Sequence, residues 1–230
     1  MTEPLLEQAE DFAQRLTDLF RQTVDPSVTF EIVGSGERIR IGPGPFDANS
    51  DGFKRVALHR YEEETDAPDR VSLKVEFTVA MGDSIHLTVE KSAFGLWVRP
   101  DQTRGARPIV RIEYDRDARS KPAAHVHFHA ESAELGWLYG TAGKTLPRMD
   151  EMHFPVGGRR FRPTIEELLL FLDREQLFND WISTNWKAVV EASLAEWERR
   201  QVHATVARNP EIAADQLRSM GYEVKSSSPE

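Results

Sequence analysis

The sequence predicts an α+β fold, an antiparallel sheet of about six to eight strands packed against an N-terminal helix and a C-terminal group of three helices. Apolar residues recur every three or four positions up to about residue 25 and again from residue 164, whereas they alternate between about residues 27 and 130. The alternating segments are separated by short, hairpin-length gaps, which favour a meander over βαβ units. We expect a single domain over residues 1–224, with the sheet region at about 27–130 and the helical region at about 164–221, followed by a disordered tail at 225–230.

The first helix is predicted from an apolar stripe that runs from Leu5 to Phe20 and ends at Asp25-Pro26. From Val28 the period changes to two, and the best alternation in the chain lies at Val71–Val79. The predicted strands are Val28–Ile32, Arg38–Ile41, Phe53–Glu62, Val71–Val79, Ile85–Val89, Phe94–Val98, Ile109–Tyr114 and His125–His129. An acidic turn is expected at Glu63–Asp69 and a short helix around Trp137–Tyr139.

Three further helices are predicted after residue 163. Thr164 followed by Glu167 has the spacing of a capping box, so a helix should begin directly after Thr164 and run through an apolar segment buried in the core. Asn179 or Asp180 is expected to cap the second helix. Asn209-Pro210 opens the third helix, and Gly221 closes it.

Composition excludes several classes of protein. The chain of 230 residues has no cysteine, so neither a disulfide nor a thiolate can act here. The N-terminal segment is acidic and amphipathic, unlike a signal peptide, and no apolar run is long enough to span a bilayer, so we expect a soluble, cytoplasmic protein without a membrane partner. The net charge of −9 argues against non-specific nucleic-acid binding. Residues 99–163 nevertheless carry a net charge of +4, which suits an anionic ligand or an acidic protein.

The most informative motif is Ala124-His125-Val126-His127-Phe128-His129, in which three histidines share one face of a predicted strand. Imidazole is a common ligand of zinc and other divalent transition metals. Same-face neighbours on a strand lie roughly 6.5–7 Å apart and the outer pair about 13 Å apart, so at most two of the three can share an ion. Further ligands would come from elsewhere, with His153, His86, Glu90, Glu113 and Glu131 as candidates.

A polar binding face without metal is the favoured interpretation. Arg111 and Glu113 should leave the sheet on the same side as the histidines if the strands are neighbours. The segment His153-Phe154-Pro155-Val156-Gly157-Gly158 precedes Arg159, Arg160 and Arg162, and arginine suits phosphate or carboxylate. The predicted ligand-binding residues are therefore His125, His129, His153, Arg159, Arg160, Arg162 and Arg111. The alternative is one zinc or other divalent transition metal on His127, His129 and His153.

Two segments resemble an uncharacterised family of actinobacterial proteins: Ala123–Glu131, and His153–Pro163 with the helix that follows it. In that family a histidine-bearing strand precedes a similar His-Phe-Pro-Val-Gly-Gly turn. The resemblance implies that His125, His129 and His153 match the family's histidines, whereas His127 departs from the pattern. It covers the middle and C-terminal parts of the chain and implies no activity.

The sequence thus predicts a cytoplasmic binding or accessory protein that acts through a face lined by histidine and arginine. Its partner would be a protein or an anionic small molecule. The alternative is a metal-dependent hydrolase or nuclease, including a toxin–antitoxin or defence component. Spacing ties no general base to a nucleophile, so the sequence leaves open whether the protein is an enzyme.

Overall fold

The computed structural model describes residues 3–34, 36–50, 52–58, 71–82, 86–99, 105–129, 151, 153–156, 162–175, 177–178 and 180–225. Several predictions lie outside these residues. They are the acidic turn at Glu63–Asp69, the short helix at Trp137–Tyr139, the roles of Glu131, Arg159 and Arg160, the cap at Asn179 and nearly all of the predicted tail.

The predicted α+β architecture is confirmed. Within the described part of the chain, eight strands form one antiparallel sheet in the order β1-β2-β4-β5-β6-β7-β8, and β3 pairs with β4 off this path. The strands are β1 (Phe30–Val33), β2 (Arg38–Pro43), β3 (Val56–Leu58), β4 (Val71–Met81), β5 (Leu87–Val98), β6 (Arg107–Asp115), β7 (Ala124–Phe128) and β8 (Phe154–Pro155). The short strand β8 was not predicted from the sequence.

One strand of the sheet is longer than predicted. The segments Ile85–Val89 and Phe94–Val98 were expected to be separate strands, but β5 runs without a break from Leu87 to Val98. The polar residues between these two segments stay paired with the neighbouring strands, because each side chain finds a suitable contact on its own face of the sheet. Ser92 is buried opposite Phe77, and Lys91 forms an ion pair with Asp115 at 3.2 Å. Cross-strand pairing therefore overrides the interrupted alternation.

The two faces of the sheet differ in character, as the alternation in β4 predicts. Leu73, Val75 and Phe77 are buried in the hydrophobic core. Lys74 and Glu76 point to the opposite face, where Glu76 lies 2.6 Å from a guanidinium nitrogen of Arg40. The helices cover the first face, and the second face carries the histidines.

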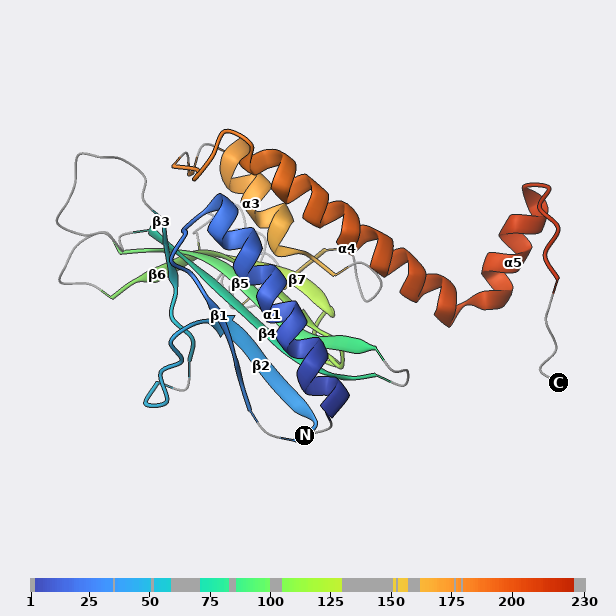
Figure 1. Cartoon of the computed structure of the whole chain (residues 1–230), viewed down its shortest axis with the longest axis horizontal. Helices are drawn as coiled ribbons and strands as arrows, with labels where there is room; N and C mark the ends of the chain where they lie inside the picture. The colour runs from blue at the N-terminus through green and yellow to red at the C-terminus, as the bar shows by residue number, and fades with distance from the viewer. Residues whose placement is uncertain are drawn as a thin grey trace, which may run out of the picture.

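Four described helices accompany the sheet: α1 (Glu3–Thr23), α3 (Ile165–Arg174), α4 (Trp186–Arg208) and α5 (Pro210–Ser219). Figure 1 shows α1 crossing in front of the strands, with α3 and α4 beside it. Phe12 of α1 joins the layers, since its ring meets Phe77 of β4 at 4.9 Å and Trp197 of α4 at 5.4 Å, both edge to face. None of the described helices is long and apolar enough to cross a membrane.

The helix starts follow local chemistry in one case and tertiary contacts in another. The predicted capping box of α3 is present, with Thr164 and Glu167 each bonding the other's backbone N–H. Helix α4 begins at Trp186, later than the predicted cap. The delay has a tertiary cause, because Trp181 stacks on Trp186 at 3.7 Å and the Ile182 N–H donates to the Thr23 carbonyl. These contacts hold the preceding residues in an irregular loop.

Candidate functional site

The register of β7 against β6 gathers polar side chains on the face of the sheet away from the helices. His125 lies opposite Glu113, and His127 lies opposite Arg111. Val126, between the two histidines, points to the other face and joins the core. The strand therefore places two imidazoles, a carboxylate and a guanidinium together, as the alternation of the sequence predicts.

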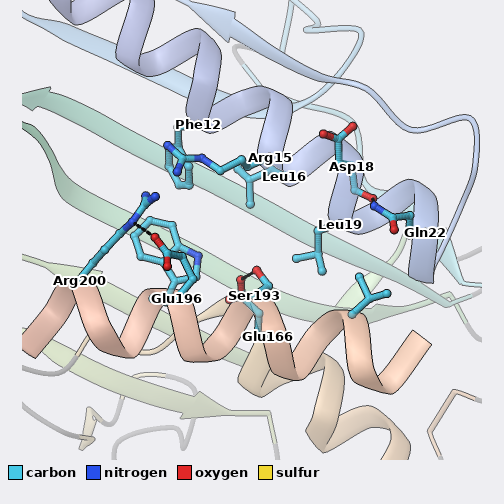
Figure 2. Close-up of a pocket in the computed structure, with 12 residues that line it drawn as sticks. Phe12, Arg15, Leu16, Asp18, Leu19, Gln22, Glu166, Ser193, Glu196 and Arg200 are labelled. Atoms are coloured by element: carbon cyan, nitrogen blue, oxygen red, sulfur yellow. Dashed lines mark hydrogen bonds and ion pairs between the residues drawn. The ribbon is translucent and has the colours of Figure 1, made fainter. Parts of the chain in front are cut away.

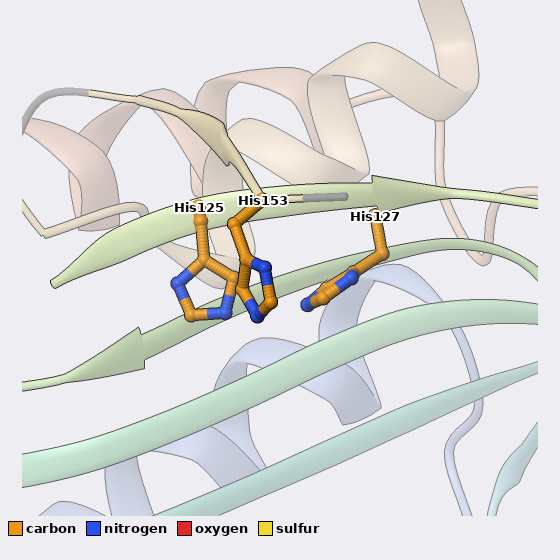
Figure 3. Close-up of side chains that lie close together, drawn as sticks. All are labelled: His125, His127 and His153. Atoms are coloured by element: carbon orange, nitrogen blue, oxygen red, sulfur yellow. The ribbon is translucent and has the colours of Figure 1, made fainter. Parts of the chain in front are cut away.

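A third histidine comes from the other neighbour of β7. His125 pairs with Pro155 and Val126 with Phe154, so the same antiparallel register brings His153 opposite His127. The side chains of His125, His127 and His153 point toward one another (Figure 3). One nitrogen from each ring can be chosen so that all three lie within 4.8 Å of one another. Two neighbouring strands thus build a cluster of three histidines, which we call the histidine cluster.

The members of the histidine cluster differ in burial. His125 is fully buried, His127 is 4% exposed and His153 is exposed. The Nδ1–H of His125 donates to the Pro122 carbonyl at 2.8 Å, because a carbonyl can only accept. In neutral His125 the lone pair is therefore on Nε2, the nitrogen nearest Glu113. A backbone carbonyl that holds a histidine in this tautomer is a common feature of metal sites.

Glu113 is the carboxylate of the site. Its Oε2 lies 3.5 Å from His125 Nε2 and 3.7 Å from His127 Nε2. Metal–ligand bonds near 2.0–2.1 Å in a tetrahedral site put neighbouring ligand atoms about 3.4 Å apart. The spacing places a carboxylate oxygen beside any ion held by these histidines. There it can coordinate the ion or accept a proton from water bound to it.

Two cations flank this carboxylate. Arg111 Nη1 lies 3.5 Å from Glu113 Oε1, and Lys121 Nζ lies 3.8 Å from Oε2. Burial is the main cause that lowers the pKa of His125, and the positive charge of Lys121 lowers it further. The hydrogen bond to the Pro122 carbonyl and the charge of Glu113 act in the opposite direction. The fold therefore favours neutral His125, the protonation state that can ligate a metal.

The remaining predicted site residues lie elsewhere. His129 follows β7, and its backbone N–H donates to the Ile109 carbonyl. The predicted metal ligands were His127, His129 and His153, but the three histidines with metal-ligand spacing include His125 instead of His129. Glu90 bonds Arg38 at 2.6 Å, and His86 is exposed. Lys121 was not identified from the sequence, and only its position in the turn before the histidine strand could have indicated it.

Arg162 lies on the helix side of the sheet. Its guanidinium lies 5.9 Å from the ring centroid of Phe77 and 5.0 Å from that of Trp197. Burial lowers its pKa to about 10, and the charge of Glu166 opposes the shift. Burial also raises the pKa of Glu166, which accepts a hydrogen bond from Ser193 Oγ at 2.6 Å. Arg162 therefore belongs to a buried polar group in the core and not to the histidine cluster.

A cleft of about 230 Å³ lies between α1 and α4 (Figure 2). Apolar residues, among them Leu16, Leu19 and Val189, line much of it. Its acidic residues are already bonded within the fold: Asp18 to Gln14 at 2.8 Å, Glu166 to Ser193, and Glu196 to Arg200 at 2.8 Å. The cleft contains no histidine, and in the described part of the chain only the histidine cluster has metal-ligand spacing, so that cluster is the stronger candidate site.

No known family profile, curated protein or solved structure matches this chain. The resemblance to an actinobacterial family and the expected cytoplasmic location therefore remain predictions. The histidine cluster and its surroundings are the features of the described residues that bear on function.

Proposed function

We propose that this protein binds one divalent transition-metal ion, zinc first among them, through His125, His127 and His153. The observation that carries the proposal is the convergence of three imidazoles from two neighbouring strands, with ligand atoms within 4.8 Å of one another. Zinc sites built from histidine require nitrogens that can approach to about 2.0–2.1 Å from one ion. In a tetrahedral site these bond lengths put neighbouring nitrogens about 3.4 Å apart, so the three imidazoles would draw closer together on binding an ion.

The orientation of His125 adds independent support. Its Nε2 is buried and has no hydrogen-bond partner in the described part of the chain, while its Nδ1 is held by the Pro122 carbonyl. A buried polar atom without a partner costs free energy unless something satisfies it. A metal ion would satisfy this nitrogen, and Glu113 would balance part of the ion's charge.

The chemistry this site supports best is metal-assisted hydrolysis. Three protein ligands, one of them exposed, leave a coordination position for water, an arrangement typical of catalytic and not of structural zinc sites. A divalent ion lowers the pKa of bound water toward about 7. In this proposal Glu113 accepts the proton, which its distance of 3.5 Å from His125 Nε2 supports.

The first test is metal content. Protein made without a histidine tag or nickel column is analysed by mass spectrometry, and chelator-treated protein is titrated with Zn²⁺ by calorimetry. We expect about one ion per chain, with the affinity reduced at least about tenfold in His127→Ala. His203→Ala is the matched control, because His203 is exposed on α4, away from the histidine cluster. Equal Zn²⁺ binding in all three proteins, or none in any, would overturn the proposal.

The hydrolytic part has its own test. Zinc-loaded protein is assayed on bis(p-nitrophenyl) phosphate, beside Glu113→Gln and the chelated protein. We expect metal-dependent release of nitrophenol that falls by roughly 10²–10⁴ in Glu113→Gln if this residue moves the proton. Stoichiometric zinc without hydrolysis of this or a carboxylic ester would leave a metal-binding protein that is not a hydrolase.

The same face supports a second candidate, the binding of an anionic partner without metal. Arg111 and Lys121 carry it, since both cations lie on the histidine side of the sheet. Binding of this kind would persist after chelation, which separates the two candidates.

A further inference from the structure

We infer that the metal centre takes a small oxyanion, a phosphate or carboxylate group, held between the ion and the cations Lys121 and Arg111. This inference rests on the proposed metal site and adds the chemical class of its substrate.

The charge around the histidine cluster is the first argument. With neutral histidines, the described ionic groups in contact there are Glu113, Arg111 and Lys121, which together carry +1. A divalent ion raises this local charge to +3, in a chain whose net charge is −9. Like charges this close repel one another unless an anion neutralises them. The loaded site therefore favours an anionic ligand.

Two neighbouring carboxylates on the described part of this face are already paired with other cations and do not supply that anion. Asp115 lies 3.2 Å from Lys91, and Glu76 lies 2.6 Å from Arg40 and 3.5 Å from Lys74. Each of these carboxylates already has a cation on its own part of the sheet. Among the described ion pairs, the excess positive charge therefore lies at the β6–β7 end, where the histidines are.

The position of the two cations is the second argument. Arg111 is in β6, directly opposite His127. Lys121 is in the turn between β6 and β7, and this turn is closed by a hydrogen bond from the Asp115 N–H to the Ala123 carbonyl. Arg111 approaches Oε1 of Glu113 and Lys121 approaches Oε2, so both cations lie next to the carboxylate of the proposed site. Their side chains are 34% and 29% exposed, so a dissolved anion can reach them.

Gly95 makes room for this arrangement on the neighbouring strand. It lies opposite Arg111, and a Cβ there would come within 3.4 Å of Arg111 Cγ and 3.0 Å of the Val110 carbonyl. It would also come within 3.1 Å of Trp97 Nε1, so glycine mainly lets the Val110 carbonyl and the Trp97 indole approach this point of β5, with the stem of Arg111 beside them. The alternation of β6 places Arg111 on the histidine side of the sheet, opposite His127.

The chemistry of these groups selects the ligand. Arginine offers a planar pair of donors that match two oxygens of a phosphate or carboxylate, and lysine adds a compact charge. A long polyanion is disfavoured, because the rest of the chain is acidic and would repel it. The expected ligand is therefore a small molecule with one oxyanion group and not a nucleic acid.

The test uses the full chain, stripped with a chelator and reloaded with Zn²⁺, whose stoichiometry is measured first. Inorganic phosphate and, in a separate titration, acetate are then titrated by calorimetry into the loaded and the stripped protein. We expect one phosphate per loaded chain, and binding about tenfold weaker in Lys121→Ala, which still holds one zinc ion. Lys91→Ala is the matched control, a cation on the same face that is paired with Asp115; it should bind phosphate like the unmodified chain.

The outcomes separate the two proposals. If no zinc binds, the proposed metal site fails and this inference fails with it. If zinc binds but phosphate and acetate do not, or if Lys121→Ala and Lys91→Ala behave alike, the metal site stands and the oxyanion site is overturned. Phosphate binding that is equally tight in the stripped protein also overturns it, since the ion would then contribute nothing.

Discussion

At the scale of single residues, the two faces of the sheet hold two separate groups of buried polar side chains. Arg162 and Glu166 are buried on the helix side of the sheet, where their opposite charges offset part of the cost of desolvation. His125 and His127 are buried on the other side, beside Glu113. Each group contains buried polar atoms without a hydrogen-bond partner among the described residues, Arg162 Nη1 and Glu166 Oε2 in the first and His125 Nε2 in the second. Only the second group also has the spacing of metal ligands.

The lowered pKa of His125 predicts how the stability of the metal-free protein varies with pH. The unfolded chain binds a proton near the ordinary pKa of 6.5, whereas the folded chain binds it only at lower pH. The stability that neutral His125 provides is therefore fully present above about pH 6.5 and is lost as the pH falls through 6.5 toward the folded pKa.

Urea unfolding of the chelated protein at pH 7.5 and pH 5.5 measures this effect. We expect a smaller difference between the two pH values in His125→Gln than in the unmodified chain, and an unchanged difference in His203→Ala. If His125→Gln retains the full difference, other groups cause the acid sensitivity.

At the scale of elements, the helices depend on different signals. Helix α3 has only 10 residues and starts at a complete capping box, and three of its leucines are buried. Helix α4 has Asn185 at its N-cap without a side-chain capping bond, and its start is set by the stacked pair Trp181 and Trp186. A capping residue should therefore matter for α3 and not for α4.

This contrast predicts the effect of two matched substitutions. Thr164→Ala removes the hydroxyl that accepts from the Glu167 N–H, and should lower the free energy of unfolding by about 1 kcal/mol. Asn185→Ala removes no such bond and should change it by less than about 0.5 kcal/mol. Urea denaturation midpoints measure both, and equal losses would show that the capping box does not determine the stability of α3.

At the scale of the whole molecule, the C-terminal helices extend away from the body. Figure 1 shows the end of α4 and all of α5 projecting beyond the sheet. Helix α5 has no buried residue, and apolar side chains on this projecting part are exposed. They are Val202, Val206, Ile212, Leu217, Met220 and Tyr222. The body therefore gains little stability from this segment.

Deleting residues 209–230 tests that inference. We expect the free energy of unfolding to change by less than about 0.5 kcal/mol, because the deletion uncovers no core residue. Leu169→Ala provides the contrast, since Leu169 is fully buried and its truncation should cost about 2–5 kcal/mol. A loss in the deletion variant comparable to that of Leu169→Ala would mean that the segment packs on the body.

Local patterns in the sequence were sufficient to predict the fold class and the part of the candidate site that β6 and β7 contribute. Alternation placed Leu73, Val75 and Phe77 in the core, and the same period of two put His125 and His127 on one face with Arg111 and Glu113. The capping box at Thr164 was equally local. These features depend on residues at most a few positions apart, or on the alternation common to every strand.

Only the tertiary structure decided which histidines meet. His153 reaches His127 because β8 pairs with β7, and no spacing along the chain encodes a pairing between segments more than 20 residues apart. The same reason explains why Arg162 lies against Phe77 on the helix side and why α4 starts at Trp186. The sequence by itself determined the faces of the strands. The pairing of distant segments, which depends on the free energy of the whole fold, determined which side chains share a site.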